Sequence, residues 1–158
     1  MRFTVPDDDQ RLSELDRLTW SAEVSPAPVP DQSASFFLRS IPGDVLVVVD
    51  TDRILGYIQI RRPTELKSND HVWEIYGLAV EPNSQSLGLG KLLVAAAIEE
   101  VRRRRGRRVT LRVLSTNERA QRLYAECGFV VAGTLNGEFS LDGVDVDDVL
   151  MARPATSD

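Results

Sequence analysis

The sequence predicts a single α/β domain, and three observations carry that prediction. The chain has 158 residues, a length that suits one domain with one hydrophobic core. Short runs rich in β-branched and aromatic residues alternate with segments that repeat apolar residues at helical spacing. In the middle of the chain an apolar run (72–80) leads through a glycine-containing loop (85–91) into a helical pattern and then another β-rich run, which is the order of a βαβ unit.

The first half of the chain is expected to contain three strands and two short helices. Pro6 ends the first strand, and the acidic residues at positions 7 to 9 suit the start of a helix. Three prolines between residues 25 and 30 predict a loop. The expected strands are 2–5, 45–49 and 54–60, the last two forming an antiparallel hairpin, and the expected helices are about 9–20 and 33–39.

The second half is expected to contain four strands and two helices. A capping-box pattern at 115–118 opens the second of these helices, and Gly128 closes it. Asp142 and Gly143 predict a two-residue turn between the last two strands. The expected strands are 72–80, 109–114, 129–140 and 144–152, and the first helix is 89–104. We expect one domain over residues 1–153 and a disordered tail at 154–158.

Composition excludes several classes of function. The net charge of −5 argues against nucleic acid as the main partner, which usually requires a basic face. Cys127 is the only cysteine and His71 the only histidine, so we expect no disulfide framework and no metal site. The first residues lack an apolar signal segment, and no apolar run reaches membrane-spanning length. A cytoplasmic protein with no membrane partner is the expected outcome.

The glycine loop predicts an anion site. A strand, a glycine loop and a helix in that order bring unpaired backbone N–H groups and the positive end of the helix dipole to one place, where Gly88 and Gly90 allow close approach. A Walker loop would need glycine at Gln85 and a hydroxyl at Leu92, and a dinucleotide fingerprint would need a small residue at Leu93. Neither pattern fits.

The motifs that remain resemble the GNAT superfamily of N-acetyltransferases. They are L78-A-V-E-P82, Q85-S-L-G-L-G90, Asn117 with Tyr124 seven residues later, and Gly128-Phe129. The resemblance implies a GNAT fold: a mixed, mostly antiparallel sheet of about seven strands, splayed between strands four and five, with about four helices on its two faces. It also implies acetyl-CoA as co-substrate, with no metal.

The resemblance assigns roles to individual positions. It implies that the backbone of Leu78, Ala79 and Val80 pairs with the pantetheine arm of the cofactor, and that Asn117 and Tyr124 also contact it. The residues expected around the diphosphate are Gln85, Ser86, Leu87, Gly88, Leu89, Gly90 and Lys91. Tyr124 is the candidate general acid for the departing thiolate, and Glu74 the candidate general base for an amine whose pKa is about 10.

Each position also has a structural alternative. Leu78 to Val80 could be an ordinary buried strand, although Gly77 within it often marks a bulge or a close backbone approach. Glu74 could be a solvated glutamate on a strand face, Tyr124 a core aromatic, and Asn117 simply the N-cap of its helix. His71 is a less favoured base, at the start of the strand.

Two further residue groups have alternatives. Cys127 fits a small buried residue better than a nucleophile. The arginine-rich run at 102–108 suits a solvated helix end that could reach the 3′-phosphate of the cofactor, and the aspartates at 142, 145, 147 and 148 suit a solvated hairpin that could attract a cationic amine.

The predicted function is transfer of the acetyl group of acetyl-CoA to a primary amine, directly within a ternary complex. In the branch that acetylates ribosomal-protein N-termini, a glutamate base stands five residues before the helix asparagine; here that position is Arg112, which favours a small-molecule acceptor over a protein amine. The alternatives are a non-catalytic acyl-CoA-binding or regulatory module and an interaction domain that uses the acidic hairpin. The acceptor, the acyl-chain length and the oligomeric state are left open, and a homodimer is compatible with the sequence.

Overall fold

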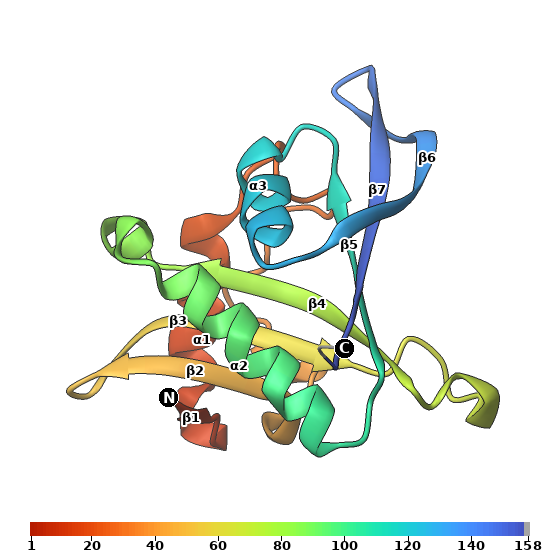
Figure 1. Ribbon diagram of the computed structural model, residues 1–158. Coiled ribbons are helices and arrows are strands. Elements are labelled where there is room, and N and C mark those ends of the chain that lie inside the picture. The colour runs from red at the N-terminus through yellow and green to blue at the C-terminus, as the bar shows by residue number, and fades with distance from the viewer. Residues whose placement is uncertain (157–158) are drawn as a thin grey trace.

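The computed structural model describes residues 1–156 and contains one seven-stranded sheet in the order β1-β2-β3-β4-β5-β7-β6 (Figure 1). The strands are β1 (Arg2–Phe3), β2 (Val45–Asp50), β3 (Arg53–Arg61), β4 (Val72–Val80), β5 (Arg108–Leu114), β6 (Val130–Leu141) and β7 (Val144–Pro154). The β4–β5 pair is parallel and the other five pairs are antiparallel. The predicted mixed, mostly antiparallel sheet is therefore confirmed.

Three α-helices and five short 3-10 helices accompany the sheet in the described residues. The α-helices are α1 (Asp9–Thr19), α2 (Leu89–Arg103) and α3 (Glu118–Glu126). The 3-10 helices are η1 (Pro6–Asp8), η2 (Phe36–Leu38), η3 (Pro42–Asp44), η4 (Lys67–Asn69) and η5 (Pro82–Leu87).

The helix expected at 33–39 is only the single turn η2. The Ser35 hydroxyl accepts from the Phe37 N–H at 3.2 Å, and the Ser40 hydroxyl donates to the Phe36 carbonyl at 3.2 Å. Serine side chains that bond to nearby backbone compete with helical hydrogen bonds, so the turn does not extend.

The α1 and α2 helices cover opposite faces of the sheet (Figure 1). On one face Leu12 and Leu15 of α1 are fully buried against residues of β2, β3 and β4. On the other face α2 buries a stripe at helical spacing that packs on the same three strands and β5. The residues of this stripe are Leu93, Val94, Ala97, Ile98 and Val101. Both faces of the central strands are thus buried, which explains their nearly continuous apolar sequence.

The parallel strands β4 and β5 diverge along their length, as Figure 1 shows. They pair only from Val72 to Ile75, opposite residues 108 to 111, although β4 continues to Val80. Next to the point of divergence, Ile75 pairs with Ile60 of β3 and Gly77 pairs with Gln59, so Tyr76 is an extra residue. This is the β-bulge that Gly77 suggested, and it turns the end of β4 away from β5.

The C-terminal end of the chain is more ordered than expected. The predicted turn is present, with Asp142 at φ +51° and Gly143 at φ +80°. The last strand continues to Pro154, and Ala155 is fully buried with its N–H donating to the Arg107 carbonyl at 2.8 Å. The expected boundary at residue 153 therefore lies inside β7, because this segment extends the sheet beside β5. Residues 157 and 158 of the expected tail lie outside the described residues.

Candidate functional site

The end of β4 presents unpaired backbone groups to the gap between β4 and β5. The Glu81 N–H donates to the Leu55 carbonyl of β3 at 2.8 Å. Since hydrogen-bonding groups alternate along an antiparallel strand, Ala79 faces β3, while the N–H and C=O of Leu78 and Val80 point away from it. Of the three residues expected to contact the cofactor, Ala79 thus faces β3, and the Val80 carbonyl accepts from Gln85 Nε2, whereas Leu78 and the Val80 N–H face the gap.

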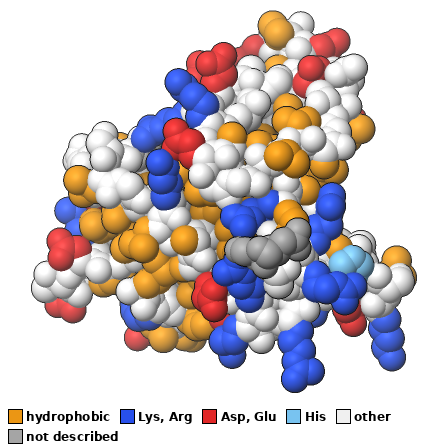
Figure 2. All heavy atoms as spheres, in the orientation of Figure 1, with side chains coloured by type: hydrophobic (Ala, Val, Ile, Leu, Met, Phe, Trp, Pro, Cys, Tyr) orange, Lys and Arg blue, Asp and Glu red, His pale blue; other side chains and the backbone are white. Residues whose placement is uncertain are grey.

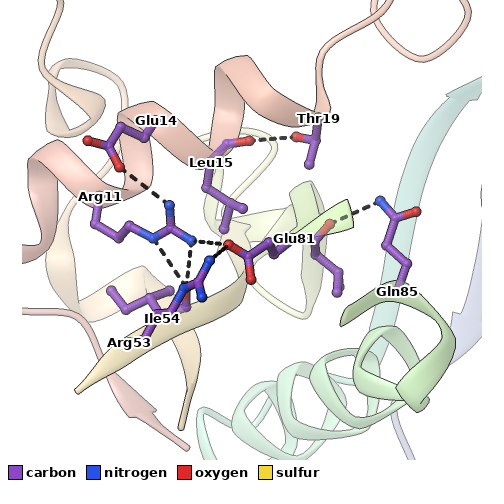
Figure 3. Close-up of polar contacts among 9 residues, drawn as sticks. Arg11, Glu14, Leu15, Thr19, Arg53, Ile54, Glu81 and Gln85 are labelled. Atoms are coloured by element: carbon purple, nitrogen blue, oxygen red, sulfur yellow. Dashed lines mark hydrogen bonds and ion pairs between the residues drawn. The ribbon is translucent and has the colours of Figure 1, made fainter. Parts of the chain in front are cut away.

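Ion pairs to the buried Glu81 fix this strand end, as Figure 3 shows. Glu81 is 5% exposed and accepts from Arg11 of α1 at 2.8 Å and also from Arg53 of β3. The Arg11 guanidinium also donates to the Ile54 carbonyl at 3.1 Å. One carboxylate thus ties α1, β3 and the start of the glycine loop together. This role of Glu81 is not apparent in the sequence, because its partners lie 70 and 28 residues away in the chain.

The glycine loop consists of η5 and the first turn of α2. The Gln85 side chain does not face the loop interior: its Nε2 donates to the Val80 carbonyl at 3.0 Å, and its Oε1 accepts from Arg119 of α3. Gln85 therefore braces the loop against the strand it follows. Ser86 and Leu87 complete η5, and Leu87 is 69% exposed.

The first backbone N–H groups of α2 are free within the described part of the chain. Gly88 adopts the left-handed conformation, with φ +74°, and supplies no side-chain cap. No described side chain accepts from the N–H of Leu89, Gly90 or Lys91. At Gly90 an added Cβ would lie 3.1 Å from Leu123 Cδ2 of α3, so this glycine lets the two helices approach. Three orphan amides at the positive end of a helix dipole fit a diphosphate group.

Asn117 and Tyr124 both belong to α3. The Asn117 side chain accepts from the Ala120 N–H at 3.1 Å, so it is the N-cap of this helix, as one alternative predicted. Tyr124 is 7% exposed and packs edge to face against Phe129, with 5.7 Å between ring centres. Burial raises the pKa of Tyr124 well above its ordinary value, so the hydroxyl keeps its proton at neutral pH.

Glu74 is not a solvated residue. It is 9% exposed, and its Oε2 accepts from Arg61 Nε of β3 at 2.7 Å. The Arg61 guanidinium also lies over the Tyr76 ring, 3.5 Å from its centre. Glu74 is therefore one half of an ion pair that joins β3 and β4.

Two polar residues beside the bulge, Tyr57 and Asp16, are not marked as site residues by any pattern in the sequence. The Tyr57 hydroxyl of β3 donates to Asp16 Oδ1 of α1. Burial raises the pKa of both groups. Asp16 follows the buried Leu12 at helical spacing, which hinted that it faces the sheet, but nothing in the sequence pairs it with a residue 41 positions later.

The arginine-rich run at 102–108 lies at the opposite end of α2 from the glycine loop. A helix of 15 residues is about 22 Å long, so the expected contact with a 3′-phosphate bound at the loop is not supported. Arg103 and Arg104 instead pair with Glu100. Figure 2 shows Lys and Arg side chains gathered beside the histidine, where a cavity of about 380 Å³ has both Arg107 and His71 in its wall. His71 is thus remote from the loop, at the start of β4.

The acidic hairpin is only partly solvated. Asp148 is 4% exposed and accepts from Arg112 Nε of β5 at 2.5 Å. Asp147 accepts from the Gly137 N–H at 2.8 Å. Asp148 is therefore occupied by Arg112 of β5, and Asp147 holds β6 with one oxygen, whereas Asp142 and Asp145 are exposed. Cys127 is half-buried, and burial raises the pKa of its thiol, which agrees with a structural residue.

Metal clusters and membrane-spanning helices are both absent from residues 1–156. No described group of three or more His, Cys, Asp or Glu side chains could hold a metal ion. None of the described helices has both the length and the apolarity needed to cross a bilayer.

Comparison with known proteins connects this geometry to a family. The model of the acetyltransferase (GNAT) family matches residues 10–129. Mycothiol acetyltransferase of Geodermatophilus obscurus is 33% identical over 90 residues, which cover 56% of this chain and 29% of that protein. The same enzyme of Actinosynnema mirum is 36% identical over 87 residues, covering 55% and 28%. The matched segment thus spans less than a third of these relatives.

Solved structures share the fold over nearly the whole chain. A protein of Streptococcus mutans has a TM-score of 0.88 and 26% identity, covering 98% of both chains. A GNAT superfamily phosphinothricin acetyltransferase from Sinorhizobium meliloti, in complex with AcCoA, has a TM-score of 0.85 and 19% identity, covering 97% of this chain and 86% of that one. The family match, the splayed sheet and the uncapped amides of α2 agree: this chain belongs to the GNAT acetyltransferase family.

Proposed function

We propose that this protein transfers the acetyl group of acetyl-CoA to a primary amine of a small molecule, by direct transfer in a ternary complex. The observation that carries the proposal is that the gap beside β4 leads along the chain to the first turn of α2. The backbone groups of Leu78 and the N–H of Val80, which point away from β3, line the gap, and the unpaired amides of Leu89 to Lys91 follow after the η5 loop. A long ligand with an amide-bearing arm and a diphosphate fits that sequence of groups.

The chain's own residues would hold the cofactor as follows. The backbone of residues 78 to 80 would pair with the pantetheine arm as another strand would, and the N–H of Val80 would polarise the acyl carbonyl. The amides of residues 86 to 91 would bind the diphosphate, with Gln85 bracing the loop and the Asn117 side-chain amide free to donate to the arm. When bound, acetyl-CoA supplies an activated acetyl thioester.

Two side chains would move protons. Glu74, whose side chain is oriented by Arg61, would take a proton from the acceptor's ammonium group directly or through water. Tyr124 would give a proton to the departing sulfur as the carbon–sulfur bond breaks and the carbon–nitrogen bond forms. The raised pKa of Tyr124 supports this role, since a phenol that stays protonated is available as a donor.

The acceptor is proposed to be a small molecule and not a protein N-terminus. The position at which the ribosomal-protein branch carries its glutamate base is Arg112, and Arg112 is held by the buried Asp148. A guanidinium in an ion pair cannot accept a proton, so the chemistry of that branch has no equivalent at this position.

Release of free thiol from acetyl-CoA in the presence of pooled amines tests the proposal, with mass spectrometry of the amine products. We expect release that depends on the amine and is nearly lost in Tyr124→Phe. Glu74→Gln should lose the rise of kcat/KM with pH. Binding of coenzyme A without thiol release from any amine would instead favour a non-catalytic acyl-CoA-binding module.

A further inference from the structure

A second group of polar residues lies on the α1 face of the sheet, beside the bulge. Tyr57 is 4% exposed, and its hydroxyl donates to Oδ1 of Asp16, which is half-buried. Phe36 packs edge to face on the Tyr57 ring, with 5.0 Å between ring centres. Among the described residues, the second oxygen of Asp16 has no hydrogen-bond or ion-pair partner. This half-buried carboxylate therefore keeps one acceptor oxygen available.

The Asp16–Tyr57 pair lies next to the proposed reaction centre. A Cβ added at Gly77 would be 3.6 Å from the Tyr57 hydroxyl, which places this hydroxyl over the bulge. Burial and the Asp16 charge are the main causes that raise the pKa of Tyr57, and the hydroxyls of Tyr124 and Tyr76 are near enough to raise it further. The pair on the α1 face thus shares its surroundings with the proposed proton donor of α3.

The charge of Asp16 favours a cationic ligand. Burial raises the pKa of Asp16, whereas the Tyr57 hydroxyl and the positive charge of Arg39 oppose that rise. Partial burial of a carboxylate with one unbonded oxygen costs free energy, and an ammonium group bound to that oxygen would reduce the cost by a charge-assisted hydrogen bond.

A cavity with two arginines in its wall lies next to this pair, because Gln59 lines the cavity and a Cβ added at Gly77 would lie 3.8 Å from Gln59 Oε1 and 3.6 Å from the Tyr57 hydroxyl. It has a volume of about 410 Å³ and lies between the segment around η2 and η3 and strand β3. Arg39 and Arg61 both contribute to its wall, and its one acidic residue, Asp44, is already paired with Arg104. Arg61 uses its Nε for Glu74, and no described residue forms an ion pair with Arg39. The cavity therefore has guanidinium groups to offer to an anion.

We propose that the acceptor is a small zwitterionic amine, whose ammonium group is bound by Asp16 and whose carboxylate is held by Arg39 and Arg61 in the adjoining cavity. This inference rests on the proposed acetyl transfer, and it adds the substrate class and three binding residues, Asp16, Arg39 and Arg61. Tyr57 is a positioning residue, since it acts by orienting Asp16.

Matched pairs of acceptors test the inference. Each pair consists of an amino acid and the amine left by removing its carboxylate: phenylalanine with 2-phenylethylamine, leucine with isoamylamine, and methionine with 3-(methylthio)propylamine. We expect kcat/KM to be at least about tenfold higher for the amino acid of the preferred pair, because a guanidinium–carboxylate hydrogen bond is lost with the decarboxylated amine. Arg39→Gln should remove most of that preference.

The isosteric variant Asp16→Asn keeps an oxygen for the Tyr57 hydroxyl but loses the charge. We expect it to raise KM for the amino acid about ten- to a hundredfold, with KM for acetyl-CoA unchanged. Asp7→Asn is the control, because Asp7 is an exposed residue of η1, just before the same helix, and its side chain has no partner among the described residues. The inference is overturned if the two variants behave alike or if decarboxylated amines are acetylated as well as amino acids.

A binding measurement separates this inference from the proposed function. The Gly77 amide signal is followed by NMR while the amino acids are added to protein saturated with coenzyme A. A shift in the wild type that is absent in Asp16→Asn supports the inference even if no amine releases thiol, an outcome that would remove only the proposed acetyl transfer. No shift with any of the three amino acids overturns it.

Discussion

Replacing Gly88 by alanine tests the left-handed conformation of the glycine loop without introducing a steric clash. Gly88 has φ +74°, and an added Cβ would meet no atom within 4 Å. The variant therefore costs only the conformational penalty of an L-residue in the left-handed region, about 1–2 kcal/mol. In a domain of this size that corresponds to a decrease of about 2–8 °C in Tm.

The same variant should weaken binding of coenzyme A. If the backbone moves to relieve the strain, the amides that follow Gly88 turn away from the ligand. Loss of one hydrogen bond to a charged group costs about 1.5–3 kcal/mol, which raises Kd about ten- to a hundredfold.

Thermal unfolding and calorimetric titration with coenzyme A check both expectations. Gly43→Ala is the control, because an added Cβ there also meets nothing within 4 Å and its φ is not positive. The control should leave Kd unchanged and Tm unchanged or slightly higher. If Gly88→Ala kept both the wild-type Tm and the wild-type Kd, the loop would not depend on the left-handed residue, and the reasoning would be refuted.

Three further predictions concern the proton donor, the ion pair behind β5 and the buried tyrosines. Tyr124→Phe should lower kcat about a hundredfold or more while Kd for coenzyme A stays the same; equal kcat in a thiol-release assay would remove the acid role. Arg112→Met leaves the buried Asp148 unpaired and should lower the free energy of unfolding, measured in urea, by about 1–3 kcal/mol. The double variant Arg112→Met/Asp148→Asn should restore most of this loss. An unchanged stability of the single variant would contradict the importance of the pair. Burial raises the pKa values of Tyr57 and Tyr124. Above about pH 10 the unfolded chain therefore loses both phenol protons, whereas the folded state keeps them. Stability is thus fully present below that pH and should fall above it by about 1.4 kcal/mol per pH unit for each tyrosine, a slope that urea titrations in Tyr124→Phe should show reduced.

The sequence predicted local features of the fold well because they depend on local patterns. The end of β4 and the start of α2 were placed by an apolar run, a proline and a glycine with a required conformation. The bulge at Tyr76 could be suspected from Gly77, although its register depends on β3. The helix expected at 33–39 is only the turn η2, because hydrogen bonds from serine side chains to the backbone limit its length.

Long-range pairings could not be predicted in the same way. The Glu81 ion pairs, the bond between Tyr57 and Asp16, and the pairing of Arg112 with Asp148 each join residues 28 or more positions apart. The residues of such pairs stand in no recognisable sequence pattern. They can pair only after the order of the strands in the sheet has brought them close together. The acidic hairpin shows the consequence, because Asp148 has a buried partner that no local pattern indicates.

Titration of the folded protein with coenzyme A and, separately, with pantetheine, which lacks the diphosphate, tests the central claim most directly. If the amides of the first turn of α2 bind the diphosphate, coenzyme A should bind one to one and far more tightly than pantetheine. No heat with coenzyme A, or equal affinity for the two ligands, would contradict it.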